Sequence, residues 1–143
     1  MADLDQITQL ITLASSDEDL AVAQHNAKKA WKKFPHNGCA ANLSALLQMA
    51  GIDVPMILGA GHLAEGLKDR GWKEVSVGDQ EPGDVGVTFD NEPSIPGADH
   101  IYLVVRVIDD DEMLIADNRE STIHTRFASG RGRTPTEYFL RAT

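Results

Sequence analysis

The sequence contains one cysteine, few aromatic residues and no long hydrophobic run. Cys39 is the only cysteine among 143 residues, so no disulfide forms within the chain. A lone cysteine indicates either a reducing compartment or a thiol kept for its reactivity. No apolar run approaches the ~18 residues of a membrane-spanning helix, and the acidic N-terminus is unlike a Sec signal. We therefore expect synthesis in the cytoplasm, with no Sec signal and no membrane span.

Basic residues are also scarce. The chain carries 13 Lys and Arg residues against 22 Asp and Glu, a formal charge of −9. Nucleic-acid phosphates require a concentrated basic face, so this balance predicts no nucleic-acid partner. The content of 42% hydrophobic and 24% charged residues is typical of a compact domain, and residues 1–143 are predicted to form a single one.

Helical patterns fill the first half of the chain and strand-like patterns the second. Apolar residues recur at helical spacing over residues 3–14, 17–34, 38–50 and 62–70, the second helix being capped by Ser16 and stopped by Pro35. Short β-prone stretches follow at residues 85–89, 100–107, 113–117, 121–127 and 137–141. The order predicts an α+β fold, with N-terminal helices packed on a small antiparallel sheet of about five strands.

Cys39 occupies a position that favours chemistry. Asn37 is the predicted N-cap of the helix over residues 38–50, which places Cys39 in its first turn. Free N–H groups and the positive end of the helix dipole lower the pKa of a thiol there, and the same groups can stabilise an oxyanion. Cys39 is therefore a candidate nucleophile. The alternative is a small, buried core residue.

His100 is the histidine best placed to act as the base. It opens a predicted buried strand after a long loop that contains Gly and Pro, a common place for catalytic side chains. The alternative is a strand-end histidine bonded to loop backbone. His124 alternates with the apolar face of its strand and is expected to point to solvent. The other histidines, His25, His36 and His62, are less favoured by their positions in the sequence.

Asp117 and Asn118 are candidates for the group that orients the imidazole. They end the strand that follows His100, and a hairpin would bring that end back beside the histidine. Asp117 is preferred because a carboxylate would both orient the ring and stabilise its charged form. The alternative for both residues is ordinary turn chemistry after a strand.

The order of these motifs resembles a known family. NGCAANLSALLQMAG, then GW and PGDV, then HIYLVV and ADN are similar to the papain-like cell-wall cysteine peptidases and amidases of the NlpC and CHAP type, over residues 36 to about 118. The resemblance implies a papain-like domain that cleaves an amide bond in the peptide part of bacterial peptidoglycan through a thioester. It makes Cys39 the nucleophile, His100 the base, and Asp117 or Asn118 the orienting group.

Two further residues are expected to contact substrate. Papain-like proteases use a glutamine six positions before the cysteine for the oxyanion, whereas Lys33 stands there in this chain, so Asn37 or a backbone group would substitute. The segment RFASGRGR contains Arg126, Arg131 and Arg133 around two glycines, and Arg131 in particular is a candidate to bind a substrate carboxylate. The alternative for this segment is a solvated hairpin loop.

The resemblance also bears on partners and delivery. The small size and missing signal are similar to amidase effectors injected by type VI secretion, which implies export to a target periplasm and an immunity or adaptor protein as partner. A phage lysin or an ordinary cytosolic enzyme would have the same features. No cofactor and no metal are expected, because the lone cysteine and scattered histidines lack the spacing of zinc ligands, and the DDDE run at 109–112 lacks the pattern of a calcium loop.

Two alternatives to a peptidoglycan amidase stay open. One is a catalytically idle papain-like module that binds a partner protein, with Cys39 only a packed thiol. The other is the same cysteine chemistry acting on a protein or isopeptide substrate, since one triad serves many acyl groups.

Overall fold

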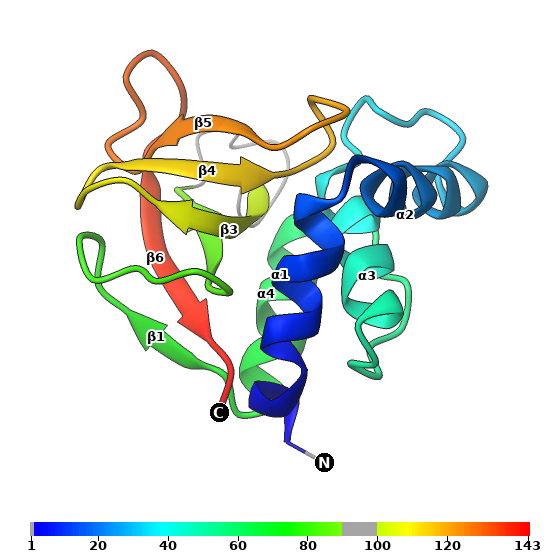
Figure 1. Cartoon of the computed structure of the whole chain (residues 1–143), viewed down its shortest axis with the longest axis horizontal. Coiled ribbons are helices and arrows are strands. Elements are labelled where there is room, and N and C mark those ends of the chain that lie inside the picture. The colour runs from blue at the N-terminus through cyan, green and yellow to red at the C-terminus, as the bar shows by residue number, and fades with distance from the viewer. Residues whose placement is uncertain (1, 90–99) are drawn as a thin grey trace.

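The computed structural model describes residues 2–89 and 100–143 (Figure 1). Its helices are the 3-10 helix η1 (Asp3–Gln6) and the α-helices α1 (Ile7–Ser15), α2 (Asp17–Ala30), α3 (Cys39–Met49) and α4 (Ala60–Asp69). Its strands are β1 (Lys73–Val75), β2 (Val85–Thr88), β3 (Ile101–Val107), β4 (Glu112–Ala116), β5 (His124–Phe127) and β6 (Thr136–Arg141). The predicted order of helices followed by strands is confirmed.

The strands form one antiparallel sheet in the order β1-β6-β2-β3-β4-β5. The α+β prediction is therefore confirmed, with six strands among the described residues where about five were predicted. The additional strand is β1, whose three residues pair with the end of β6. A segment this short has too few residues to show an alternating pattern, so sequence periodicity does not reveal it.

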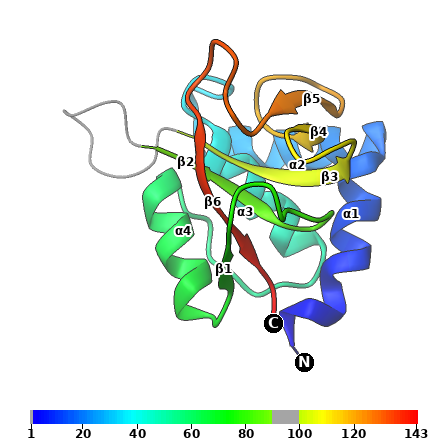
Figure 2. The ribbon, with the colours of Figure 1, turned by 90° about the vertical axis from the view of Figure 1, so that its left-hand side faces the viewer.

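The helices cover one side of the sheet, as Figures 1 and 2 show from two directions. The larger apolar core lies between the helices and the sheet, and it includes α3 along most of its length. A second core covers the other face of the sheet; its buried members are Tyr102, Val104, Met113, Ile115, Ala128 and Phe139. Both faces of the central strands are consequently buried, which a simple alternation of apolar and polar residues does not predict.

The boundaries of α2 agree with prediction at its start and differ at its end. Ser16 caps the helix, and its side-chain oxygen accepts a hydrogen bond of 3.2 Å from the backbone N–H of Asp19. The helix ends at Ala30, earlier than the predicted residue 34. The indole Nε1 of Trp31 then donates to the carbonyl oxygen of His36 at 2.7 Å, which stabilises the turns that lead to Cys39.

The predicted cap of α3 is wrong. Gly38, not Asn37, is the N-cap residue, and glycine has no side chain with which to cap the helix. Asn37 has a φ of 52°, in the left-handed region, so it lies in the turn before the helix.

Helix α4 begins at Ala60, two residues earlier than predicted. No helix among residues 2–89 and 100–143 is long and apolar enough to cross a membrane.

We predict that Gly86→Ala destabilises the protein by about 1–3 kcal/mol, because overpacking a rigid core has this cost. Gly86 pairs with Tyr102 across β2 and β3, and a Cβ at Gly86 would overlap the Tyr102 ring. The ring is fully buried and its hydroxyl is hydrogen-bonded to Thr136 Oγ1 at 2.6 Å, so it has no room to move. Urea unfolding measures the change.

The matched control is Gly66→Ala within α4. There a Cβ meets only Ile57 Cδ1 at 3.4 Å, so the substitution should stabilise the helix by about 0.5–1 kcal/mol. Equal effects of the two substitutions would contradict the assigned role of Gly86.

Candidate active site

Cys39 is the first residue of α3 and is 7% exposed. Helix α3 packs against α2 and β3, and residues 39–47 are all buried. The helix N-terminus leaves backbone N–H groups without partners inside the helix, and its dipole favours negative charge. The fold therefore presents the thiol in an environment that stabilises a thiolate.

His100 directly precedes β3 and is held by β2. Its backbone N–H donates to Thr88 Oγ1 at 2.9 Å, and its carbonyl oxygen accepts from the Thr88 backbone N–H at 3.1 Å. The imidazole is hydrogen-bonded through Nε2 to Asp117 Oδ2 at 2.9 Å, and the Cys39 thiol is near enough to raise its pKa. The long loop before His100, on which its sequence prediction rested, lies outside the described residues. The histidine side chain is 5% exposed.

Asp117 follows β4, and the pairing of β3 with β4 brings it to the start of β3. Ala116 pairs with Leu103, so Asp117, the residue after β4, lies beside the start of β3 and near His100. The Asp117 carboxylate is completely buried and accepts three hydrogen bonds. The donors are His100 Nε2 to Oδ2, and His124 Nε2 (2.8 Å) and the Arg119 backbone N–H (2.9 Å) to Oδ1.

The electrostatics of these three groups favour charge separation. Burial opposes ionisation of the Cys39 thiol, but His100 and the N–H groups of Ile101 and Ala40 outweigh it, so the pKa of Cys39 lies below its ordinary value. Burial also opposes a charged His100, yet hydrogen bonds to Asp117 and Cys39 raise its pKa.

The Asp117 carboxylate shows the same balance. Burial alone would raise its pKa, whereas the hydrogen bonds from His100 and His124 hold that pKa well below the usual range. Together these shifts favour a thiolate–imidazolium pair supported by an ionised carboxylate. That arrangement is suited to nucleophilic attack on a carbonyl carbon followed by protonation of a leaving amine.

Asn118 does not contact the His100 ring. Its Nδ2 donates to the carbonyl oxygen of Pro35 at 2.6 Å, so it connects the loop after β4 to the segment that leads into α3. Of the two candidates for the orienting group, the structure places only Asp117 on His100. Asn118 instead stabilises the approach of the two segments that carry Asp117 and Cys39.

The prediction that His124 points to solvent is wrong. His124 lies directly opposite Ile115 in the pairing of β4 with β5, and Ile115 belongs to the second core. Directly paired residues share a face of the sheet, so the His124 ring is directed to a face that is itself buried. Its side chain is 24% exposed and bonds Asp117. A signal for this contact was present in the sequence, because His124 lies on the predicted strand that comes directly after the one ending at Asp117.

The two residues expected to contact substrate form none of the hydrogen bonds found for Cys39, His100 or Asp117 within residues 2–89 and 100–143. Asn37 is exposed in the turn just before α3. Arg131 lies over the Phe127 ring at 4.0 Å and pairs with Asp111 at 3.4 Å, with its side chain 61% exposed. Arg126 in the same segment is buried, and its Nη2 donates to the carbonyl oxygen of Thr134 at 2.7 Å.

The remaining histidines, His25, His36 and His62, are exposed. Among the residues that the structure describes, no group of three or more His, Cys, Asp or Glu side chains is placed to hold a metal ion.

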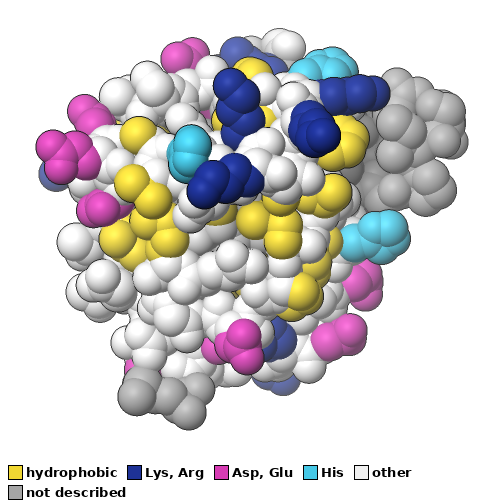
Figure 3. All heavy atoms as spheres, turned by 90° about the vertical axis from the view of Figure 1, so that its right-hand side faces the viewer, with side chains coloured by type: hydrophobic (Ala, Val, Ile, Leu, Met, Phe, Trp, Pro, Cys, Tyr) yellow, Lys and Arg dark blue, Asp and Glu magenta, His cyan; other side chains and the backbone are white. Residues whose placement is uncertain are grey.

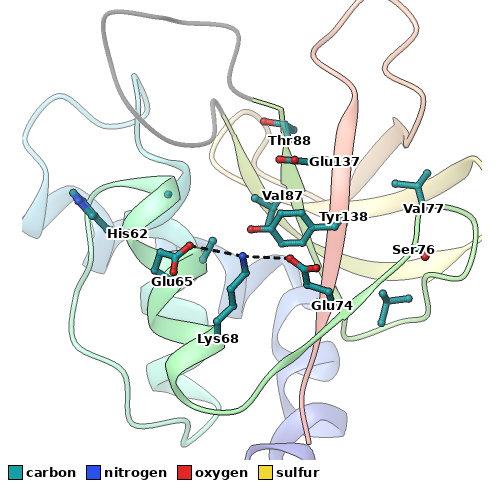
Figure 4. Close-up of a pocket in the computed structure, with 13 residues that line it drawn as sticks. His62, Glu65, Lys68, Glu74, Ser76, Val77, Val87, Thr88, Glu137 and Tyr138 are labelled. Atoms are coloured by element: carbon teal, nitrogen blue, oxygen red, sulfur yellow. Dashed lines mark ion pairs between the residues drawn. The ribbon is translucent and has the colours of Figure 1, made fainter.

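A cavity of about 930 Å³ lies between α4 and strands β1, β2 and β6 (Figure 4). Lys68 lies within it, 3.3 Å from Glu74 and 3.7 Å from Glu65, with its ammonium 4.5 Å from the centre of the Tyr138 ring. The cavity reaches Thr88, the residue that holds the His100 backbone. It therefore ends at the part of β2 that bonds the His100 backbone.

Comparison with known proteins finds a likeness in one crystal structure, described as a protein similar to lipoprotein of the NLP/P60 family from Staphylococcus aureus. The identity is 16% and the TM-score 0.46, over 88% of this chain and 42% of that one. The chain thus spans less than half of that protein's length, and the likeness concerns the course of the backbone. No family model and no curated protein matches the chain.

We predict that iodoacetamide alkylates Cys39 rapidly at pH 6, where an ordinary thiol with a pKa of about 8.5 is almost fully protonated. The lowered pKa of Cys39 keeps a thiolate present below that value. His100→Ala removes the cation that stabilises it, so the midpoint of the rate against pH should move upward. Mass spectrometry of quenched samples measures the rates.

The matched control is His25→Ala, an exposed histidine on α2. It should leave the alkylation profile unchanged. A wild-type thiol no more reactive at pH 6 than free cysteine would contradict the ion pair.

Proposed function

We propose that this protein is a cysteine hydrolase that cleaves an amide bond in the peptide part of bacterial peptidoglycan. The observation that carries the reaction type is the chain of contacts from the Cys39 thiol to the His100 ring and on to the buried Asp117 carboxylate. The choice of substrate class is supported by the resemblance of residues 36–118 to the NlpC and CHAP cell-wall enzymes.

In the first half of the reaction, the Cys39 thiolate attacks the carbonyl carbon of the scissile amide. A C–S bond forms and the carbonyl oxygen takes up negative charge, which the free N–H groups at the start of α3 stabilise. The C–N bond then breaks, and His100 gives its proton to the leaving amine. The product is a thioester on Cys39.

In the second half, water hydrolyses the thioester. His100, now neutral, takes a proton from the water as it attacks, and the C–S bond breaks to release the carboxylic acid and restore the thiolate–imidazolium pair. Asp117 bonds the ring through Nε2 throughout, which leaves the other ring nitrogen available for proton transfer. This fixed orientation is the function that we assign to Asp117.

The cavity beside α4 is a suitable place for part of the substrate chain. It combines apolar walls, formed by Val75, Val77 and Val87, with the charged groups around Lys68. A stem peptide that carries methyl groups, amines and carboxylates would find complementary groups there. We assign no single subsite to it, and the scissile bond is for product analysis to identify.

We predict that purified peptidoglycan releases defined peptide fragments with the wild-type protein and none with Cys39→Ala, since the nucleophile is then lost. His100→Ala should lower the rate about 10²- to 10⁴-fold, the usual contribution of a general base and acid. Mass spectrometry of the soluble fragments identifies the bond that is cleaved.

The His25→Ala variant is again the control, and circular dichroism shows whether each variant is folded. Failure of the folded wild type to release fragments would contradict the peptidoglycan assignment. Rapid alkylation of Cys39 in that case would favour an isopeptide or another acyl substrate, and an ordinary thiol would favour a module that only binds a partner protein.

A further inference from the structure

Two imidazole rings share the Asp117 carboxylate. His100 Nε2 lies 2.9 Å from Oδ2, and His124 Nε2 lies 2.8 Å from Oδ1. The carboxylate is fully buried and the His124 side chain is 24% exposed. The reaction described above uses the Oδ2 side alone and assigns no role to His124.

A buried carboxylate needs donors on both oxygens to keep one orientation. The backbone N–H of Arg119 is two residues away on the same turn, so its bond to Oδ1 moves with that turn. His124 comes from β5, which the pairing of Ile115 with His124 holds against β4. Its bond therefore ties the carboxylate to the sheet itself.

We propose that His124 is a positioning residue, whose Nε2–H bond to Oδ1 holds the Asp117 carboxylate so that Oδ2 accepts from His100. The proposal rests on the proposed function, because it assumes that His100 serves Cys39. The side chains that face this carboxylate are the two imidazoles, and the guanidinium of Arg126 on β5 is a charged group nearby. His124 acts through Asp117 and contacts no reacting atom.

Two variants with side chains of nearly equal shape test whether the hydrogen bond donated by His124 Nε2–H is required. His124→Gln places an amide Nε2–H close to the position of the imidazole Nε2–H, and His124→Met has the same length without a donor. The readout is the rate of Cys39 alkylation by iodoacetamide against pH, which reports on the Cys39–His100 pair without any substrate. Both variants lack the imidazole, so any difference between them isolates the hydrogen bond.

His124→Gln should keep the wild-type profile within about twofold. His124→Met should react about tenfold more slowly at pH 6, with its midpoint raised by about one unit. Equal rates in wild type and His124→Met would overturn the proposal, as would Gln and Met variants that are slowed to the same extent.

Nuclear magnetic resonance of the wild-type protein provides a measurement that does not depend on the folding of a variant. Long-range ¹H–¹⁵N correlations show whether Nε2 of His124 carries a proton. A protonated Nε2 is expected, and an unprotonated one would overturn the proposal because it has no hydrogen to donate. If the wild-type protein does not cleave peptidoglycan, the proposed function is contradicted. The alkylation profiles of the His124 variants and the protonation of His124 Nε2 do not depend on that outcome.

A separate observation concerns the basic surface formed by Lys28, Lys29, Lys32 and Lys33. These residues are four of the six lysines in a chain of net charge −9, and all four are exposed. None of them forms an ion pair with a described residue. Figure 3 views the side on which α2 lies and shows Lys and Arg side chains gathered there, with acidic side chains toward the margins.

The basic surface borders the candidate active site. Its lysines flank the start of the segment 31–38, which runs from α2 to Cys39. That segment is bonded to Asn118 through the carbonyl oxygen of Pro35. Helix α2 itself also contacts the site, because Gln24 Nε2 donates to the carbonyl oxygen of Asp117 at 3.2 Å. An anionic polymer on this surface would thus lie next to the reacting groups.

We infer that the basic surface binds the carboxylates of peptidoglycan and so offsets the repulsion between an acidic protein and an anionic wall. This inference rests on the proposed substrate. It assigns to the basic surface the cationic role that the sequence suggested for the segment at 126–133, where Arg126 is buried and Arg131 is paired.

The test uses Cys39→Ala protein, which binds without cleaving, and insoluble peptidoglycan sacculi as the probe. Lys28→Gln, Lys29→Gln and Lys32→Gln together should weaken co-sedimentation about tenfold at low salt and flatten its dependence on NaCl. The control triple, Lys73→Gln, Arg106→Gln and Arg133→Gln, makes the same change in net charge at exposed positions elsewhere. It should weaken binding less than about twofold.

Equal weakening by the two triples would overturn the inference, because net charge alone would then explain it. Binding of the Cys39→Ala protein that does not depend on salt would overturn it as well. Cleavage of peptidoglycan is measured separately, with active protein. A failure of the basic surface to bind sacculi is therefore distinguishable from a failure of the protein to cleave them.

Discussion

The buried Asp117 carboxylate is the interaction on which the site depends. Removing an ion from water costs several kcal/mol unless partners compensate, and this carboxylate has its partners on three segments: His100 before β3, His124 on β5 and the Arg119 N–H after β4. Two of these partners, the imidazoles of His100 and His124, reach the carboxylate only when the strands pair. The candidate active site is therefore a product of strand pairing, and the helical layer adds only Cys39 to it.

The sheet can bring these groups together because both of its faces are buried. One face packs on the helices and positions α3, while the other carries the second core, on the side to which Ile115 and His124 are directed. Gly86 leaves room on β2 for the Tyr102 ring, which belongs to that second core. Cys39 thus belongs to the core between the helices and the sheet, and Asp117 follows β4, whose Met113 and Ile115 belong to the second core.

Charge is divided unevenly over the molecule. The acidic groups outnumber the basic ones, yet the lysines of α2 and the following turns gather beside the segment that leads to Cys39. The cavity beside α4 instead combines Lys68 with Glu65 and Glu74, in ion pairs open to solvent. Partly exposed pairs of this kind contribute little stability, so their arrangement bears more on what the cavity binds than on folding.

What the sequence by itself determined is local. The start of α2 at Ser16, the place of Cys39 in the first turn of a helix and the strand that begins after His100 follow from capping, apolar spacing and β-propensity, which act over a few residues. Tertiary structure decided the rest. Whether Asp117 or Asn118 meets the imidazole depends on strand register, and the direction of His124 depends on a second core that periodicity does not reveal. Both are set by contacts between segments distant in the chain, and no local pattern encodes them.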